Sequence, residues 1–436
     1  MGDDTEIPFS ELVEVNPHVD LRGLHDEAQV SFIPMSDVSD SGRWLGRQER
    51  CLADVRVGYT SFAEGDLLFA KITPCMENGK GALASSLVNG IGFGSTEFHV
   101  LRARDGTDPR FIFHWLQSTQ LRRRALAFMG GSAGQQRVQE DFFDHFRIPR
   151  TDPIEQTRIA AVLDLIDGAI AKTEAVIAKL KQVREGLLHD LLTRGIDENG
   201  ELRDPVAHPE RFQKTALGQV PAEWVCEQLG PRLRRAGGFI QTGPFGSQLH
   251  ASEYTPEGVP VVMPQDIVDG RIVPNQIARI PDAGAKDLKR HYLALGDLLF
   301  ARRGELSKCA CVSSCQGGWL CGTGCLLLRA GGAAIRGEWL SLMYRHSVGQ
   351  RQIAALAVGT TMVNLNTSTL ERLNFGFPGE AEQAEIATRV SSADGAVDEE
   401  LRVHEKLARL KSGLRADLLT GRVRVPESVF AAEAPA

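Results

Sequence analysis

Five of the eight cysteines lie close together, and clustered thiols are the first side chains to consider for metal chemistry. They are Cys309, Cys311, Cys315, Cys321 and Cys325. A structural zinc site uses paired C-x-x-C segments, whereas these spacings are irregular and the only nearby histidine, His291, lies well upstream. We therefore expect no metal site. Because Cys325 lies in an apolar, strand-like run, small core residues explain the cysteines better.

A second set of polar residues follows strand-like runs and suits contacts with nucleic acid. Lysine and arginine supply charge for phosphates, and glycine allows close backbone approach. Amide and guanidinium side chains are the usual bidentate partners of adenine and guanine edges. The candidate DNA-binding residues are Lys71, Thr73, Asn78, Lys80, Gln135, Gln136, Arg137, Arg302, Arg303, Asn364 and Asn366. Turn formation, helix capping or a solvated surface is the alternative for each of them.

The sequence lacks the motifs by which enzymes that act on nucleic acid bind a base, a cofactor or a nucleotide phosphate. We find no Asn/Asp-Pro-Pro-Tyr/Phe motif to hold a flipped adenine and no glycine-rich turn for a cofactor. Asn78-Gly79-Lys80 lacks both the upstream glycine and the following Ser or Thr of a phosphate-binding loop. The sequence predicts a chain that is catalytically silent alone and holds no cofactor itself.

An internal repeat organises these residues. The matched segments keep a nearly constant separation along the whole chain, so one unit is written twice. The pairs are Gly65–Lys71 with Gly296–Arg302, Thr96–Ala103 with Thr323–Ala330, Trp115 with Trp339, Glu155–Ala160 with Glu382–Ala387, and Asp190–Thr193 with Asp417–Thr420.

Each copy has a globular part and a helical part, which makes the predicted fold class α+β. The globular parts are rich in Gly, Pro, β-branched and aromatic residues, with strand-like runs at 67–72, 98–101 and 298–301. One amphipathic helix is expected in each, over 109–128 and 337–357. The predicted parts are a globular domain at 1–150, a long helix within 151–200, a linker at 201–216, a globular domain at 217–378, a long helix within 379–425, and a flexible tail at 426–436.

Both helical parts carry the three-and-four spacing of a coiled-coil seam. The seam residues are Ile159, Val162, Ile166, Leu180 and Leu187 in the first copy, and Ile386, Val390, Leu407 and Leu414 in the second, with Val176, Val183, Leu401 and Leu410 on the same expected faces. About 40 residues at ~1.5 Å each make a rod of ~60 Å. Because one narrow apolar stripe needs a partner, we expect the rods to pack antiparallel on each other. Two unrelated surface helices are the alternative.

Charge and hydropathy restrict the function further. The net charge of −7 argues against a protein that coats nucleic acid nonspecifically, although basic clusters remain at Arg122–Arg124 and Arg302–Arg303. No apolar run approaches the ~18 residues of a membrane span, and the N-terminus lacks the pattern of a signal peptide. We therefore expect a cytoplasmic protein with reduced thiols and no membrane partner.

Two similar domains on a spacer of fixed length suit the binding of two separated short sites on duplex DNA. The chain resembles the specificity subunit of Type I restriction-modification systems over nearly its whole length. The resemblance rests on Glu155-Gln156 and the helix that ends at Leu191-Leu192-Thr193, on their repeat, and on the domain opening Leu217–Pro221 with Trp224 and Gly243–Ser247.

This resemblance implies two target-recognition domains that each read half of a split, asymmetric DNA site. It also implies that the paired helices set the gap and bind two modification subunits, which carry S-adenosylmethionine and methylate adenine at N6. Restriction subunits with ATP and Mg would complete the complex. Two alternatives remain: an assembly protein that makes only protein contacts, and a fused enzyme with an unrecognised motif.

Overall fold

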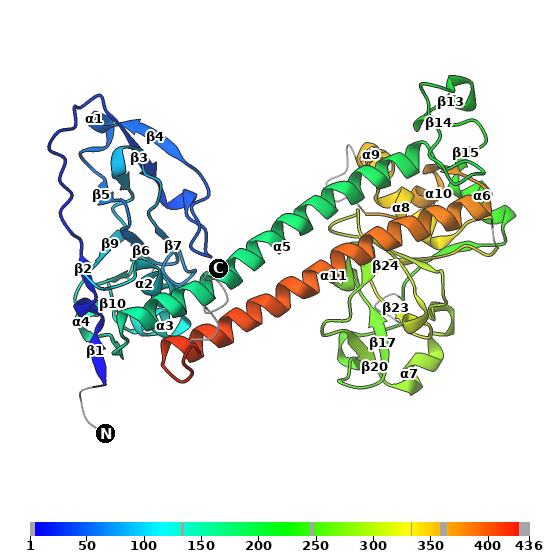
Figure 1. Ribbon diagram of the computed structural model, residues 1–436. Helices are drawn as coiled ribbons and strands as arrows, with labels where there is room; N and C mark the ends of the chain where they lie inside the picture. The colour runs from blue at the N-terminus through cyan, green and yellow to red at the C-terminus, as the bar shows by residue number, and fades with distance from the viewer. Residues whose placement is uncertain (1–4, 132–134, 245–247, 333, 358–363, 427–436) are drawn as a thin grey trace. The chain divides into compact units, whose positions relative to one another are not determined.

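The computed structural model describes residues 5–131, 135–244, 248–332, 334–357 and 364–426. Part of the expected domain opening, residues 245–247, and nearly all of the expected tail, residues 427–436, lie outside these ranges. The chain forms two compact units. The first combines residues 1–175 with 401–436, and the second contains residues 176–400. Both unit boundaries fall inside long helices, which are coloured green and orange in Figure 1.

The first unit contains two four-stranded sheets. Their strand orders are β4-β3-β8-β5, in which β3 and β8 are parallel, and β2-β9-β6-β7, which is antiparallel. The strands are β1 Glu6–Pro8, β2 Val13–Val15, β3 Gln29–Ile33, β4 Gln48–Cys51, β5 Thr60–Ala63, β6 Leu67–Ala70, β7 Gly81–Leu83, β8 Ile91–Gly94, β9 Phe98–Ala103, β10 Met129–Gly130, β11 Arg137–Val138 and β12 Arg147–Pro149. The short helices are α1 Leu52–Val55, α2 Pro109–Leu116, α3 Thr119–Ala127 and α4 Phe142–His145.

The second unit repeats this plan with one strand fewer: its sheets are the four-stranded β16-β24-β21-β22 and the three-stranded β20-β17-β23, in which β17 and β23 are parallel. Its strands are β13 Phe212–Thr215, β14 Gly218–Pro221, β15 Val225–Gln228, β16 Phe239–Thr242, β17 Val259–Val262, β18 Ile267–Val268, β19 Arg271–Ile272, β20 Ala278–Ile280, β21 Leu298–Ala301, β22 Cys309–Cys311, β23 Leu320–Cys321, β24 Cys325–Arg329 and β25 Asn374–Phe377. Its short helices are α6 Leu229–Arg235, α7 Asp282–Asp287, α8 Gly337–Arg345, α9 Ser347–Ala357 and α10 Thr367–Glu371.

The central sheets of the two units have the same order and direction, which confirms the predicted repeat and the mixed α+β class. In each, the Leu-Leu-Phe-Ala strand, β6 or β21, pairs antiparallel with the strand that carries the second repeated segment, β9 or β24. All four residues of β6 and of β21 are buried, because apolar side chains on both faces of the strand meet packed layers.

The expected single helix in each globular part is wrong, because the chain breaks it into two. In the first unit α2 ends at Leu116, and Ser118 caps α3, since its hydroxyl accepts the backbone N–H of Leu121. The proposed match of Trp115 with Trp339 is also wrong. Trp339 is the third residue of α8 whereas Trp115 is the seventh of α2, so Trp339 corresponds to Phe111.

A buried ion pair recurs in both central sheets. Asp66 accepts two hydrogen bonds from Arg102, both of 2.7 Å, and one from the backbone N–H of Ala63. Asp297 is held in the same way by Arg329, at 2.8 and 2.6 Å, and by the N–H of Ala294. Since the two carboxylates are only 1% and 2% exposed, each depends on its arginine for compensation.

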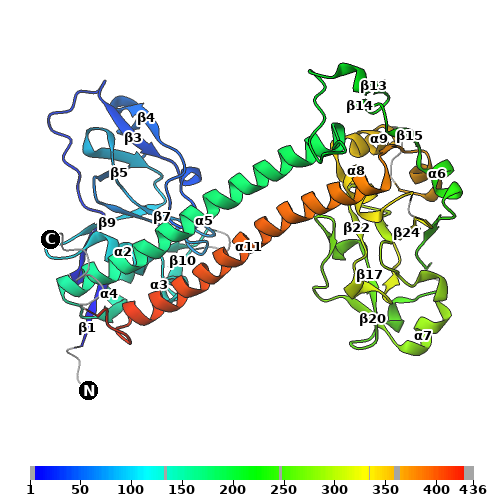
Figure 2. The ribbon, with the colours of Figure 1, turned by 45° about the vertical axis from the view of Figure 1, so that its right-hand side comes forward.

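The two long helices are α5, Pro153–Thr193, and α11, Glu380–Leu419, and they pack together as predicted (Figures 1 and 2). Within the first unit, the beginning of α5 lies beside the end of α11, where Asp167 pairs with Lys411. Within the second unit, Arg184 of α5 donates to Asp394 of α11 at 2.6 Å. These pairs occupy corresponding positions of the repeat, so the helices run antiparallel in both units.

The expected seam is right at some positions and wrong at others. Ile159, Ile386 and Val390 are buried, and Val162, Ile166, Leu180, Leu187, Leu407 and Leu414 are half-buried. Val176, Val183, Leu401 and Leu410 are instead 42–54% exposed. Leu163, Ile170 and Ile177, seven residues apart, occupy the seam of α5, while polar His404 and Lys411 occupy part of that of α11.

A glutamine at the start of each long helix ties it to its globular part. Gln156 donates to the carbonyl of Thr151 and accepts the N–H of Asp108, just before α2. Gln383 donates to the carbonyl of Pro378 and accepts the N–H of Arg336, just before α8. Both side chains are buried, so the amide satisfies backbone groups that would otherwise lack partners.

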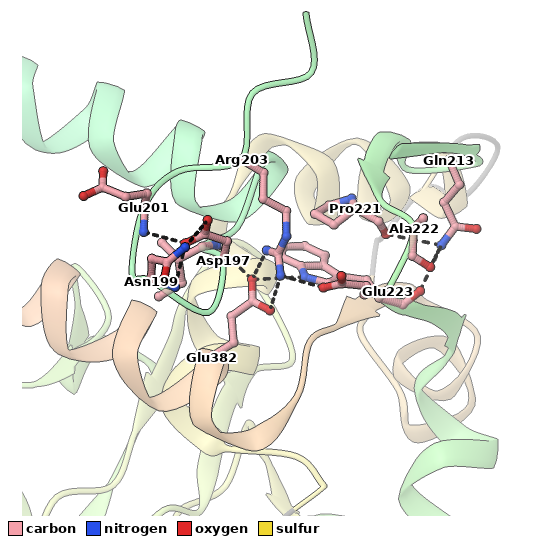
Figure 3. A network of polar contacts seen from close by, with 11 residues as sticks. Asp197, Asn199, Glu201, Arg203, Gln213, Pro221, Ala222, Glu223 and Glu382 are labelled. Carbon is pink, nitrogen blue, oxygen red and sulfur yellow. Dashed lines mark hydrogen bonds and ion pairs between the residues drawn. The ribbon is translucent and has the colours of Figure 1, made fainter. Parts of the chain in front are cut away.

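The glutamate that precedes each of these glutamines binds the backbone that follows the other long helix. Glu155 accepts the N–H of Val425, which follows α11, at 3.1 Å. Glu382 accepts the N–H of Ile196, which follows α5, at 2.9 Å, and also binds Arg203 (Figure 3). Arg203 pairs further with Glu223, so the expected linker is fixed within the second unit.

The helix ends are buried accordingly. Leu191 and Leu192 of α5 lie in the core of the second unit with Trp224. Leu418 and Leu419 of α11 lie in the core of the first unit with Trp115. Across the part of the chain that the structure describes, no helix has the length and apolar character that crossing a membrane requires.

Replacing either buried aspartate should loosen its own unit. We expect Asp66→Ala to destabilise the first unit by about 3 kcal/mol, because it leaves Arg102 uncompensated, and Asp297→Ala to do the same to the second. Amide hydrogen exchange of β6 and β21 measures the two units separately. Asp20→Ala, which removes an exposed pair with Arg22, is the control and should leave exchange unchanged. Equal loosening by all three variants would contradict the assignment.

Candidate nucleic-acid interface

In the first unit, two candidate segments that are far apart in the sequence lie side by side. The loop after β6 runs along β11 and the residues before it. The backbone N–H of Thr73 donates to the carbonyl of Gln136 at 3.1 Å, and that of Val138 donates to the carbonyl of Lys71 at 2.9 Å. The structure thereby brings Lys71, Thr73, Gln136 and Arg137 together.

The second unit builds the same backbone junction after β21. The N–H of Leu365 donates to the carbonyl of Arg302 at 2.9 Å, as Val138 does to Lys71 in the first unit. The N–H of Arg302 donates to the carbonyl of Gly324 at 2.8 Å, and that of Lys71 donates to the carbonyl of Glu97 at 2.9 Å. Two identical scaffolds therefore present different side chains.

The charges on the two scaffolds differ. In the first unit, Arg137 donates to both carboxylate oxygens of Glu97, at 2.9 and 2.7 Å. These hydrogen bonds from Arg137 lower the pKa of Glu97, and the pKa of Arg137 is raised in turn. In the second unit the corresponding residues are Gly324 and Asn364, which cannot form such a pair. The first junction is thus partly neutralised by its own carboxylate.

Three of the predicted residues already have structural roles. Besides Arg137, Lys80 donates to the carbonyl of Met35 at 3.1 Å. The Asn366 side chain caps α10, since it accepts the N–H of Thr369 at 2.8 Å. The cap alternative therefore holds for Asn366, whereas Arg137 and Lys80 make contacts with distant residues that the sequence did not predict.

Other predicted residues keep polar groups available. Asn78 and Asn364 are exposed, and within the described residues their amide groups have no hydrogen-bond partner. Gln135 and Arg303 are exposed as well, while Lys71 and Gln136 are half-buried. Arg302 is also half-buried, but its side chain already has an interaction partner. The hydroxyl of Thr73 is buried without a hydrogen-bond partner among the described residues. These groups could donate to or accept from base edges and phosphates.

Sequence reasoning missed Glu97, which decides the charge of the first junction. The repeat contained a signal for Glu97, because Thr96-Glu97 aligns with Thr323-Gly324. A glutamate in one copy and a glycine in the other indicate that the two positions differ in charge. The pairing with Arg137 needed the fold, since forty positions separate the two residues.

Three of the five clustered cysteines are core residues, as expected, whereas Cys311 is half-buried and Cys315 is exposed. Cys309, Cys321 and Cys325 are fully buried, and burial raises the pKa of the Cys309 and Cys325 thiols to about 12. All eight cysteines are free. Among the described residues, no group of three or more His, Cys, Asp or Glu side chains is placed to hold a metal ion.

Comparisons with known sequences identify related proteins, although no protein-family profile matches the chain. The specificity subunit of the Type I restriction enzyme EcoAI from Escherichia coli is 41% identical over 155 residues, which is 35% of this chain and only 26% of that relative. The MjaVIII specificity subunit from Methanocaldococcus jannaschii is 22% identical over 332 residues, which is 74% of this chain and 72% of the relative.

A solved structure extends the likeness to the whole fold. The Type I restriction-modification S subunit from M. genitalium aligns with 96% of this chain and 97% of its own, with a TM-score of 0.56 and 15% identity. The expected resemblance to the specificity subunits of Type I restriction-modification systems is therefore confirmed, by local sequence and by fold.

Proposed function

We propose that the chain is the DNA sequence-specificity subunit of a Type I restriction-modification complex. Each unit reads one half of a bipartite, asymmetric site in double-stranded DNA. The observation that carries the proposal is the duplicated junction after β6 and β21, where one backbone scaffold presents Glu97 and Arg137 in one copy and Gly324 and Asn364 in the other. Equal scaffolds with unequal polar groups suit two unequal half-sites.

The long helices give the proposal its spacing. Because α5 and α11 each continue from one unit into the other, their length limits the gap between the half-sites. The paired charges Asp167–Lys411 and Arg184–Asp394 hold the helices in one register, which keeps that gap constant.

The helices also supply docking positions for two modification subunits, which methylate adenine at N6. Exposed apolar side chains outside the seam, such as Leu165, Val183 and Leu410, are suited to this contact, because buried seam residues such as Ile386 are not accessible. S-adenosylmethionine, ATP and Mg belong to the modification and restriction subunits. In this proposal the chain itself is non-catalytic and works in the cytoplasm, where those subunits and the DNA are.

The first experiment is genome-wide mapping of N6-methyladenine in host cells that express the chain with its modification subunits. We expect a two-part motif that disappears when the gene is deleted. Exchange of residues 217–378 for those of a related subunit should change one half of the motif and leave the other. If the chain is confirmed to be expressed and deletion of its gene still leaves the methylation pattern unchanged, the chain is an assembly protein that contacts no DNA.

Single amide variants test the two junctions. Asn78→Ala should relax one half of the motif and Asn364→Ala the other, because each removes an exposed amide that could contact a base, with a loss of about 1–3 kcal/mol of discrimination. The same methylation mapping measures this. Asn366→Ala is the control: it removes the α10 cap and should cost about 1 kcal/mol of stability without changing the motif. Relaxation of both halves by one variant would refute independent reading.

A further inference from the structure

A cavity of about 340 Å³ in the first unit is lined by four cations. It lies between the loop after β6, the first turns of α3 and the end of α11. The cations are Arg122, Arg123, Lys411 and Arg415. Asp40 and Glu77 are the carboxylates in the lining, and both are exposed. The deeper cations therefore face a cavity whose acidic groups reach into solvent.

The two deepest arginines have no carboxylate partner. Arg122 is 9% exposed and donates to the backbone carbonyls of Met76 and Gly79. Arg415 is half-buried and donates to the carbonyl of Gln117 at 2.8 Å. Among the described residues neither forms an ion pair, and the Nε–H of each is buried without a hydrogen-bond partner. Asp167, the partner of Lys411, also attracts Arg415, but burial still lowers the pKa of Arg415. Buried cations with so little compensation are unfavourable, and a bound anion would relieve them.

The positive charges of neighbouring side chains make a bound anion in this cavity still more favourable. Burial, with the neighbouring Arg415, lowers the pKa of Arg122 to about 10. Burial and Arg415 also lower the pKa of Lys411, against the effect of its carboxylate partner Asp167. Thr119, the first residue of α3, lines the same cavity, so the positive end of that helix adds to the field.

The second unit repeats the fold and keeps cations at the positions of Lys411 and Arg123, which are Arg184 and Arg351, but it lacks the two deepest arginines. In the repeat, Leu188 stands at the position of Arg415, and Gln350 stands at that of Arg122. The fold therefore does not need the two arginines, since α5 and α9 form without them. Their presence in one unit only points to a ligand rather than to a general packing role.

We propose that this cavity binds a phosphate group, and that the group is a backbone phosphodiester of the duplex held by the first unit. The location supports the duplex as the source, because the exposed Asn78 of the candidate interface lines the same cavity. Arginine offers the planar donors that match phosphate oxygens. The duplex as source rests on the proposed function, whereas the phosphate site itself does not.

Salt dependence of duplex binding by the full chain tests the duplex source. Arg415→Leu installs the residue of the second repeat, and we expect it to make the slope of log K against log salt shallower by about 0.9 for one lost phosphate. Arg415→Lys keeps the charge and should retain the slope. Arg409→Leu removes an exposed arginine of the same helix, which pairs with Glu405, and should also retain the slope. Fluorescence anisotropy with a labelled duplex measures all four proteins.

Thermal unfolding in inorganic phosphate, compared with chloride at equal ionic strength, tests the site without DNA. Phosphate should raise the Tm of the wild type and of Arg409→Leu more than that of Arg415→Leu. If this difference appears while the anisotropy slopes are equal, the cavity takes free phosphate and the duplex source is overturned. Equal behaviour of Arg415→Leu and Arg409→Leu in both measurements overturns the site.

The two proposals can fail separately. A wild type with no salt-dependent affinity for any duplex would contradict the proposed function and the duplex source, while the phosphate measurement would still decide the site. Weaker binding of modification subunits by Arg415→Leu, with an unchanged slope, would assign the cavity to a carboxylate of a protein partner and overturn the proposal.

Discussion

The structure depends on one constraint: each long helix has an apolar seam that must be covered along its whole length. Neither α5 nor α11 can cover its own seam, so each needs the other. Buried Leu163 and Ile170 on one helix and Val390 and Val397 on the other satisfy this requirement. The ion pair Asp167–Lys411 and its repeat then select one register, because a shifted helix would separate the charges.

The globular parts are fastened to this pair by side chains at the helix starts. Gln156 and Gln383 bind backbone groups on both sides, and Glu155 and Glu382 receive the chain after the opposite helix. These four residues explain why the sequence Glu-Gln occurs at both helix starts. The repeated motif is a structural junction, and the polar groups available for recognition lie elsewhere, after β6 and β21.

Much of this could be predicted from the sequence, since the repeat and the periodic spacing are local patterns. The buried Leu-Leu-Phe-Ala strands, the long helices and their pairing follow from residue types at fixed intervals. The spacing predicts Leu401 and Leu410 in the seam of α11, because apolar residues in this part of the helix fit two different stripes. In the structure His404 and Lys411 face α5 instead, where they bind Glu174 and Asp167. The roles of Arg137 and Lys80 also needed the fold, because their partners Glu97 and Met35 lie forty or more residues away.

Each long helix begins in one unit and ends in the core of the other, and this affects the order in which the two units can fold. The second unit consists of the continuous segment 176–400, whereas the first needs residues 401–425 to fill the place of Leu418, Leu419 and Val425 in its core. During synthesis the second unit can close while the first still exposes this apolar slot. The N-terminal unit is therefore the last to be finished, and a chain that stops before α11 ends leaves it open.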